Sequence, residues 1–271
     1  MAELVEYLNA PATPEHPWAM KRAKWGNPEP YRVRYFELGN ESSHGSHNLV
    51  PRRHYTPEEY AAYFRSCAAA MRRVDPAVQI GIVMEPGTGE QHDSPWNRTV
   101  LEKAGKEADF VVLHFYAPRI ADQTPQQALA AVLAYGDQVE FRLKQYREQA
   151  RALTGRELPL AMTEFNIGST GNKPYPWRFS FLAGLMNADL LRIWLKPENG
   201  ILCANYWQVV NGYWGSFRSN EKGEITLRRA PVSFFETWGG YTGSELVQTA
   251  VANAPRLDAA PVPGLAVSRG G

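Results

Sequence analysis

The sequence has few cysteines and no long apolar segment. Only Cys67 and Cys203 occur among its 271 residues, and no Cys-x-x-Cys pair is present. This count excludes a disulfide framework and a cysteine-rich zinc site. No run of about 18 apolar residues is present, so the sequence predicts no membrane span.

The sequence also has no excess of positive or negative charge. Twenty-nine basic residues face twenty-eight acidic ones, for a formal net charge of +1. This balance gives no electrostatic reason to expect nucleic acid or a membrane surface as a partner. Near the N-terminus, Glu3 and Glu6 stand where a signal peptide has basic residues. The absence of a visible signal peptide favours a cytoplasmic location.

Three histidines, His44, His47 and His54, lie close together in the sequence and suggest a metal site. No acidic or cysteine ligand stands at a suitable spacing from them, so we interpret this segment as a solvated loop. We therefore expect no metal and no cofactor.

Aromatic residues are abundant, with eight Trp and thirteen Tyr. Most are expected to fill the core, although aromatic rings also stack on the faces of sugars. For Trp177, Trp207 and Trp214, stacking on a sugar and packing within the protein are both open interpretations.

Short apolar runs alternate with helical patterns between residues 33 and 210. Such alternation predicts parallel β/α units and an α/β fold. Strands are expected at 33–38, 79–84, 109–116, 158–165 and 201–209, and helices at about 57–71, 94–108, 125–153, 177–195 and 233–238. We expect a partial (β/α)8 barrel of about five units.

Five units are three short of a closed eight-stranded barrel. The first thirty-two residues do not supply strands, because the region from Ala10 to Pro30 is rich in proline and is expected to be a loop. We therefore expect a fragment, with residues 1–242 as an incomplete barrel domain and 243–271 as the beginning of a C-terminal β segment. Open sheet edges predict a homo-oligomer or another association through those edges.

Two glutamates directly follow or end predicted strands. Glu41 follows the run Tyr35-Phe36-Glu37-Leu38, and Glu164 lies near the end of the strand that contains Met162. Polar residues at the carboxyl ends of barrel strands form active sites. A pair of carboxylates is what cleavage of a glycosidic bond requires.

Several motifs together resemble the α-L-arabinofuranosidases of glycoside hydrolase family 51, in clan A. The resemblance covers roughly residues 3 to 250. The motifs are Asn27-Pro28-Glu29-Pro30-Tyr31, Gly39-Asn40-Glu41, His114-Phe115-Tyr116, Thr163-Glu164-Phe165-Asn166, and Gln208 with Asn211. Gly-Asn-Glu alone is shared across the clan, whereas the combination is more specific.

The resemblance implies catalytic roles for both glutamates. Glu41 would be the general acid/base, and Glu164 the nucleophile of a retaining enzyme that releases terminal arabinofuranose from arabinose-containing oligosaccharides or polysaccharides. It also implies substrate-site roles for Asn40, His114, Tyr116 and Gln208, with Tyr116 orienting Glu164. Trp177 is a further candidate for the sugar site.

Two alternatives remain open from the sequence. Another clan A retaining glycosidase, such as an endoglucanase or a β-xylosidase, shares the two glutamates. A catalytically silent sugar-binding fragment is the second alternative, because the family's first barrel strands and most of its C-terminal β-sandwich are expected to be missing.

Overall fold

The structure is a computed structural model. It describes residues 1–43, 53–85, 94–120, 123–168, 176–210, 212 and 214–241, together with 243, 245, 247, 249, 250, 252 and 253. The chain divides into two compact units. Unit 1 comprises Met1–Leu113 and Tyr146–Ala161, and unit 2 comprises His114–Gln145 and Met162–Gly271.

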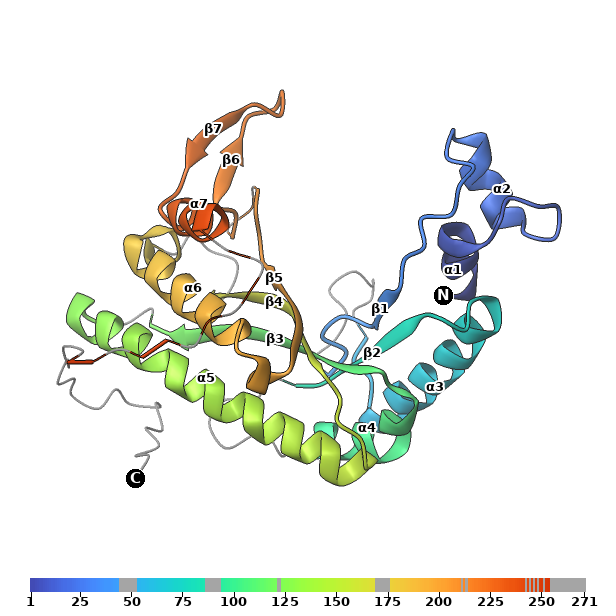
Figure 1. The fold of residues 1–271 in the computed structure, drawn as a ribbon, viewed down its shortest axis with the longest axis horizontal. Helices are drawn as coiled ribbons and strands as arrows, with labels where there is room; N and C mark the ends of the chain where they lie inside the picture. The colour runs from blue at the N-terminus through green and yellow to red at the C-terminus, as the bar shows by residue number, and fades with distance from the viewer. Residues whose placement is uncertain are drawn as a thin grey trace. The chain divides into compact units, whose positions relative to one another are not determined.

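Five strands form one sheet in the order β1-β2-β3-β4-β5. The pairs β1–β2 and β2–β3 are parallel, as short strands joined by helices require. Their bounds are Tyr35–Leu38 for β1, Gln79–Val83 for β2, Phe110–Arg119 for β3, Leu160–Gly168 for β4 and Ile201–Tyr206 for β5 (Figure 1). All five expected strands are present, and the fold is the predicted partial (β/α)8 barrel.

Helices join the strands of this sheet. They are α3 (Pro57–Val74), α4 (Pro95–Ala104) followed by η2 (Gly105–Glu107), α5 (Pro125–Thr154) and α6 (Phe181–Trp194), with the single turns η3 (Pro176–Phe179) and η4 (Pro197–Asn199). A last helix, α7 (Pro231–Tyr241), follows β5 and a two-stranded hairpin. Local sequence explains where α3 begins. Thr56 accepts a hydrogen bond from the backbone of Glu59, whose side chain accepts one from the backbone of Thr56, and Pro57 occupies the first helical position.

Unit 1 contains a helix that the sequence did not predict. The segment from Ala10 to Pro30 was expected to be a loop, but it contains α2 (Pro17–Lys24), which packs against α1 (Ala2–Asn9). The expectation was wrong because Pro17 stands at the start of the helix, where its missing N–H costs nothing. Fully buried Arg22 then fixes the following turns by donating to the carbonyls of Tyr7, Ala10, Asn27 and Pro28.

Unit 2 contains a hairpin that was also not expected. Strands β6 (Phe217–Ser219) and β7 (Ile225–Arg228) pair antiparallel. Beside them, α6 and α7 lie side by side (Figure 1). Phe234 packs on Phe181 with ring centroids 5.0 Å apart, and a β-carbon at Gly184 would lie 2.1 Å from the Phe234 ring. Glycine at 184 therefore permits the close contact between these helices.

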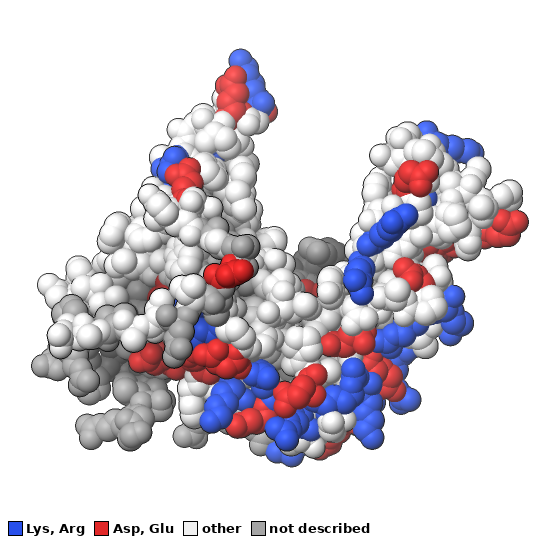
Figure 2. Space-filling view, viewed as in Figure 1, with Lys and Arg blue, Asp and Glu red and all other residues white. Residues whose placement is uncertain are grey.

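Charged side chains of both signs are interspersed on the face shown in Figure 2. In unit 1, Arg72 pairs with Asp109 at 2.6 Å and Arg65 with Glu107 at 2.9 Å.

Within the described part of the chain, no helix combines the length and apolar character needed to cross a membrane. Of the C-terminal β segment expected at 243–271, the structure describes only residues 243, 245, 247, 249, 250, 252 and 253, and none of these lies in a strand.

Candidate active site

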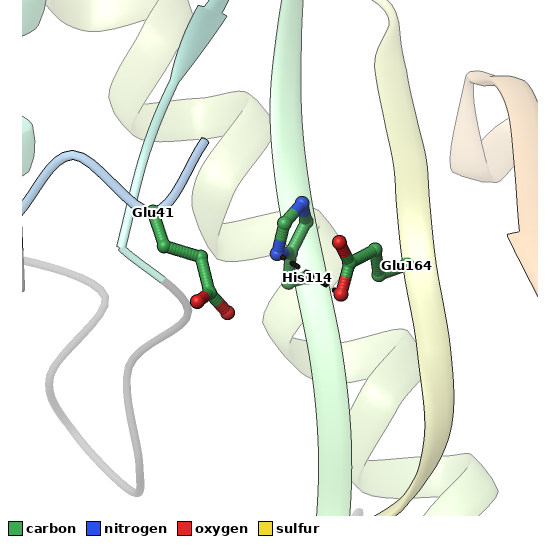
Figure 3. A group of neighbouring side chains, drawn as sticks. All are labelled: Glu41, His114 and Glu164. Atoms are coloured by element: carbon green, nitrogen blue, oxygen red, sulfur yellow. Dashed lines mark ion pairs between the residues drawn. The ribbon is translucent and has the colours of Figure 1, made fainter. Parts of the chain in front are cut away.

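In unit 2, β3 and β4 bring three of the predicted site residues together. His114 and Tyr116 are two positions apart on β3, so their side chains leave the same face of the strand. The Tyr116 hydroxyl donates a hydrogen bond to Glu164 Oε2. His114 Nδ1 lies 3.7 Å from the same carboxylate oxygen, shown by the dashed line in Figure 3. The sheet thus surrounds one carboxylate with two polar groups.

A further contact fixes the histidine. His114 Nε2 lies 3.1 Å from Thr163 Oγ1, next to Glu164 on β4. The side chain of His114 is only 6% exposed and that of Glu164 is 18% exposed. A buried histidine with this hydrogen bond at Nε2 has little freedom to turn. The sequence placed Thr163 in the motif around Glu164 but gave it no role of its own, because its partner lies on the neighbouring strand.

The carboxyl end of β4 is joined to β5 through Asn166. Its Nδ2 donates to the carbonyl oxygen of Trp207 at 2.7 Å, and the Trp207 N–H donates to the carbonyl of Phe165 at 3.2 Å. Asn166 is fully buried. Tyr206, at the end of β5, has its pKa raised by burial, which outweighs its hydrogen bonds to Ser216 and Asn166 and the nearby positive charge of Arg178. At neutral pH the Tyr206 hydroxyl is therefore uncharged.

Gln208 and Trp177 also lie in unit 2, after β5 and in η3 respectively. Gln208 follows the cis peptide bond between Trp207 and itself, and its side-chain amide donates to the carbonyl of Val210 at 2.8 Å. Trp177 is half-buried in η3, where its carbonyl accepts a hydrogen bond from the Ser180 hydroxyl. Their sugar-binding roles remain predictions. Asn211, His44 and His47 lie outside the described residues, and His54 is exposed.

In unit 1, Asn40 and Glu41 follow β1 directly. The backbone turns sharply here, with φ of 107° at Gly39 and 47° at Glu41. A β-carbon at Gly39 would lie 2.5 Å from the Ser42 hydroxyl oxygen, so glycine is required on steric grounds as well. A glutamate with positive φ is uncommon, and backbone strain of this kind is concentrated at functional sites.

Tyr60 of α3 holds the strand end that precedes this turn. Its hydroxyl donates to the carbonyl of Leu38 at 2.7 Å and accepts from the N–H of Val83 at 2.8 Å. The residue is fully buried, and burial raises the pKa of its hydroxyl. One neutral phenol therefore joins the ends of β1 and β2 and fixes where the Gly39-Asn40-Glu41 turn begins.

The two glutamates have different local surroundings. Glu164 is mostly buried and accepts a hydrogen bond from a phenol, which suits a carboxylate that must keep one orientation while it attacks an electrophilic carbon. Glu41 extends from a strained turn after β1 (Figure 3). Such an arrangement is suited to a group that exchanges protons with a leaving group or with water.

The chain matches one family model and several characterised proteins. The model for the alpha-L-arabinofuranosidase 1 domain matches residues 1–129. An intracellular exo-alpha-(1->5)-L-arabinofuranosidase of Streptomyces lividans is 30% identical over 174 residues, which are 61% of this chain and 24% of that protein. An exo-alpha-(1->6)-L-arabinofuranosidase of Bifidobacterium longum is 29% identical, covering 77% of this chain and 43% of that protein.

Solved structures show the same fold. The alpha-L-arabinofuranosidase of Thermotoga maritima, in an arabinose complex, superposes with a TM-score of 0.67 at 24% identity and covers 86% of this chain and 45% of its own. A family 51 alpha-L-arabinofuranosidase from Bifidobacterium longum has a TM-score of 0.69 at 19% identity and covers 88% of this chain and 50% of its own. The chain thus spans about half the length, or less, of the proteins it matches.

Proposed function

Because this chain is related to the α-L-arabinofuranosidases of glycoside hydrolase family 51, we propose that it supplies both catalytic carboxylates of a retaining exo-acting α-L-arabinofuranosidase. The observation that supports this most strongly is the Glu164 carboxylate, held by Tyr116 and beside His114 at the end of β4. The substrate class is an oligosaccharide or polysaccharide with terminal arabinofuranosyl groups.

The proposed reaction has two displacements. In the first, a Glu164 oxygen bonds to the anomeric carbon while the glycosidic bond breaks, and Glu41 donates its proton to the departing oxygen. In the second, Glu41 takes a proton from water, whose oxygen attacks the same carbon and releases Glu164. Two inversions leave the anomeric configuration unchanged. Such a mechanism needs the two carboxyl groups about 5–5.5 Å apart in the working enzyme.

Kinetics of glutamate variants test both roles in the complete gene product. Glu164→Ala should abolish turnover of 4-nitrophenyl α-L-arabinofuranoside and of natural oligosaccharides alike. Glu41→Ala should lose much more activity on the oligosaccharides, because nitrophenolate leaves without protonation. Glu157→Gln is a control, since this exposed glutamate pairs with Arg147 at 3.3 Å and precedes the amino end of β4, whereas Glu164 lies towards its carboxyl end.

The set of glycosides that the wild-type protein cleaves tests its proposed substrate specificity. Wild-type protein that cleaves a β-xyloside or a cello-oligosaccharide and ignores the arabinofuranoside would show a different retaining glycosidase. Soluble, folded protein with no turnover of any of these glycosides would favour a silent sugar-binding role. Equal losses for Glu41→Ala on good and poor leaving groups would contradict its role as the acid.

A further inference from the structure

Unit 2 contains a fully buried cation close to the Glu164 cluster. Arg178 lies in η3 and has no exposed surface. Burying a guanidinium removes it from water at a large cost in free energy, so its surroundings must compensate for the loss. Its charge also acts on Tyr206 at the end of β5. None of the motifs that indicate the two glutamates includes this arginine.

The guanidinium stacks on an indole ring. Arg178 Cζ lies 3.3 Å from the centroid of the Trp214 ring. A cation over the face of tryptophan is attracted by the charge distribution of the ring, and the attraction is stronger where water is excluded. Because Arg178 occupies one face of Trp214, that face is not available to a sugar. For this ring, packing within the protein is the interpretation that the structure supports.

Trp214 in turn contacts the residue that holds the nucleophile. The rings of Trp214 and Tyr116 are 4.8 Å apart between centroids, at an interplanar angle of 61°. This is an edge-to-face contact, which favours one orientation of the phenol. The Tyr116 hydroxyl donates to Glu164 Oε2. A continuous series of contacts therefore leads from Arg178 through Trp214 and Tyr116 to the carboxylate.

We propose that Arg178 is a positioning residue for the Glu164 nucleophile and that it acts through Trp214 and Tyr116. The inference rests on the proposed function of Glu164. A displaced nucleophile reacts much more slowly even when substrate still binds, since an error of about 1 Å can cost on the order of 100-fold in rate. The planar guanidinium matters because it stacks along the indole, whereas an ammonium acts as a point charge.

A double-mutant cycle in the complete gene product separates positioning from simple support of the fold. Arg178→Met should lower kcat on 4-nitrophenyl α-L-arabinofuranoside about tenfold and change KM less than about twofold. In a Tyr116→Phe background the same substitution should cause little further loss, because the hydroxyl through which it acts is already gone. Arg178→Lys, which keeps the charge, should recover part of the activity.

Variants of Trp214 test the same contacts if Arg178→Met folds poorly. Trp214→Leu interrupts the same series of contacts and should show the same dependence on Tyr116, while Trp214→Phe should retain most of the activity. Lys21→Met is the matched control, because it removes a cation 3.7 Å from the Trp18 ring in unit 1 and should leave kcat unchanged. All assays are carried out well below the melting temperature of each variant.

The inference is overturned by an equal loss from Arg178→Met with and without the Tyr116 hydroxyl, by unchanged kcat, or by a change in KM alone. If wild-type protein turns over no glycoside, the proposed function fails, and a separate readout still tests the contact. In protein labelled with 3-fluorotyrosine, the fluorine resonance assigned by Tyr116→Phe should shift in Arg178→Met. An unchanged resonance contradicts the inference without any activity assay.

Discussion

At the scale of single residues, the surroundings of Glu164 are asymmetric. The hydroxyl of Tyr116 and Nδ1 of His114 both approach Oε2. Because the hydrogen bond from the phenol is made to one of the two oxygens, it restricts rotation of the carboxylate. We therefore assign the phenol a role in orienting Glu164, and removal of its hydroxyl tests that role.

Tyr116→Phe should lower kcat about 10- to 150-fold, the equivalent of about 1.5–3 kcal/mol for a hydrogen bond to a charged group. The ring remains to pack on Trp214, so the melting temperature should change little. Steady-state kinetics and thermal unfolding measure the two effects. A large fall in melting temperature with kcat per folded molecule unchanged would show that the hydroxyl serves stability alone.

At the scale of elements, helices fix the ends of the strands that precede the site residues. Tyr60 on α3 joins β1 to β2, and the Glu140–Lys196 ion pair, 2.6 Å long, joins α5 to η4 in unit 2. Each contact lies outside the cluster around Glu164. Their loss should therefore appear first as reduced stability.

Tyr60→Phe leaves a buried carbonyl at Leu38 and a buried N–H at Val83 without their partner. An unsatisfied buried group costs about 1–3 kcal/mol, so the free energy of unfolding should fall by about 2–4 kcal/mol in total. Tyr63→Phe, on the exposed side of the same helix, is the control and should cost less. Urea denaturation gives both values, and equal costs would contradict the role assigned to Tyr60.

The stabilisation by Glu140 should depend on pH. Burial raises the pKa of this carboxyl, but hydrogen bonds from Lys196 and Asn199 outweigh burial and leave the pKa below its usual value. A lowered pKa in the folded state means that the stabilisation is present at neutral pH and is lost as the pH falls through that lowered value. Glu140→Gln should therefore lower the free energy of unfolding at pH 7, by about 1 kcal/mol at most.

Near pH 3, below the usual carboxyl pKa of about 4.3, the difference between Glu140→Gln and wild type should shrink. Glu157→Gln, whose carboxylate is 56% exposed, should show a smaller difference at pH 7. A difference for Glu140→Gln that grows on acidification would contradict the assignment.

The sequence predicted those elements whose residues follow one simple pattern. The apolar runs of β2, β3 and β4 and the amphipathic repeat of α3 gave the expected strands and helix. The hairpin β6–β7 was missed because its strands have only three and four residues, too few for the alternation Ile-Thr-Leu-Arg in β7 to stand out, and all four residues of β7 are exposed. Helix α2 was missed because its proline was interpreted as part of a loop.

Some residues of the candidate site were likewise indicated by the sequence, and others were not. Glu41 and Glu164 stand at strand ends within recognisable motifs, so the sequence indicated both. The contact between Arg178 and Trp214 joins residues that are distant in the chain, and no local pattern reports such a pairing. Thr163 is similar, because its partner His114 lies on the neighbouring strand.

At the scale of the whole molecule, the chain spans about half the length, or less, of its relatives. In the described sheet, β1 and β5 each have a single neighbouring strand. Unpaired strand edges tend to associate with other chains. We expect this chain, expressed alone, to have a mass in light scattering well above its 30.4 kDa. A monodisperse monomer over a wide range of concentrations would contradict this expectation.

The proposed mechanism requires that Glu164 form a covalent bond with the sugar. The most direct test is to react the Glu41→Ala variant of the complete gene product with 4-nitrophenyl α-L-arabinofuranoside, quench it in acid and sequence its peptides by mass spectrometry. Loss of the acid/base slows release of the intermediate, so the peptide containing Glu164 should gain the mass of one arabinosyl group on that residue. Nitrophenol release without any adduct on Glu164, together with a sugar product of inverted configuration, would contradict the account.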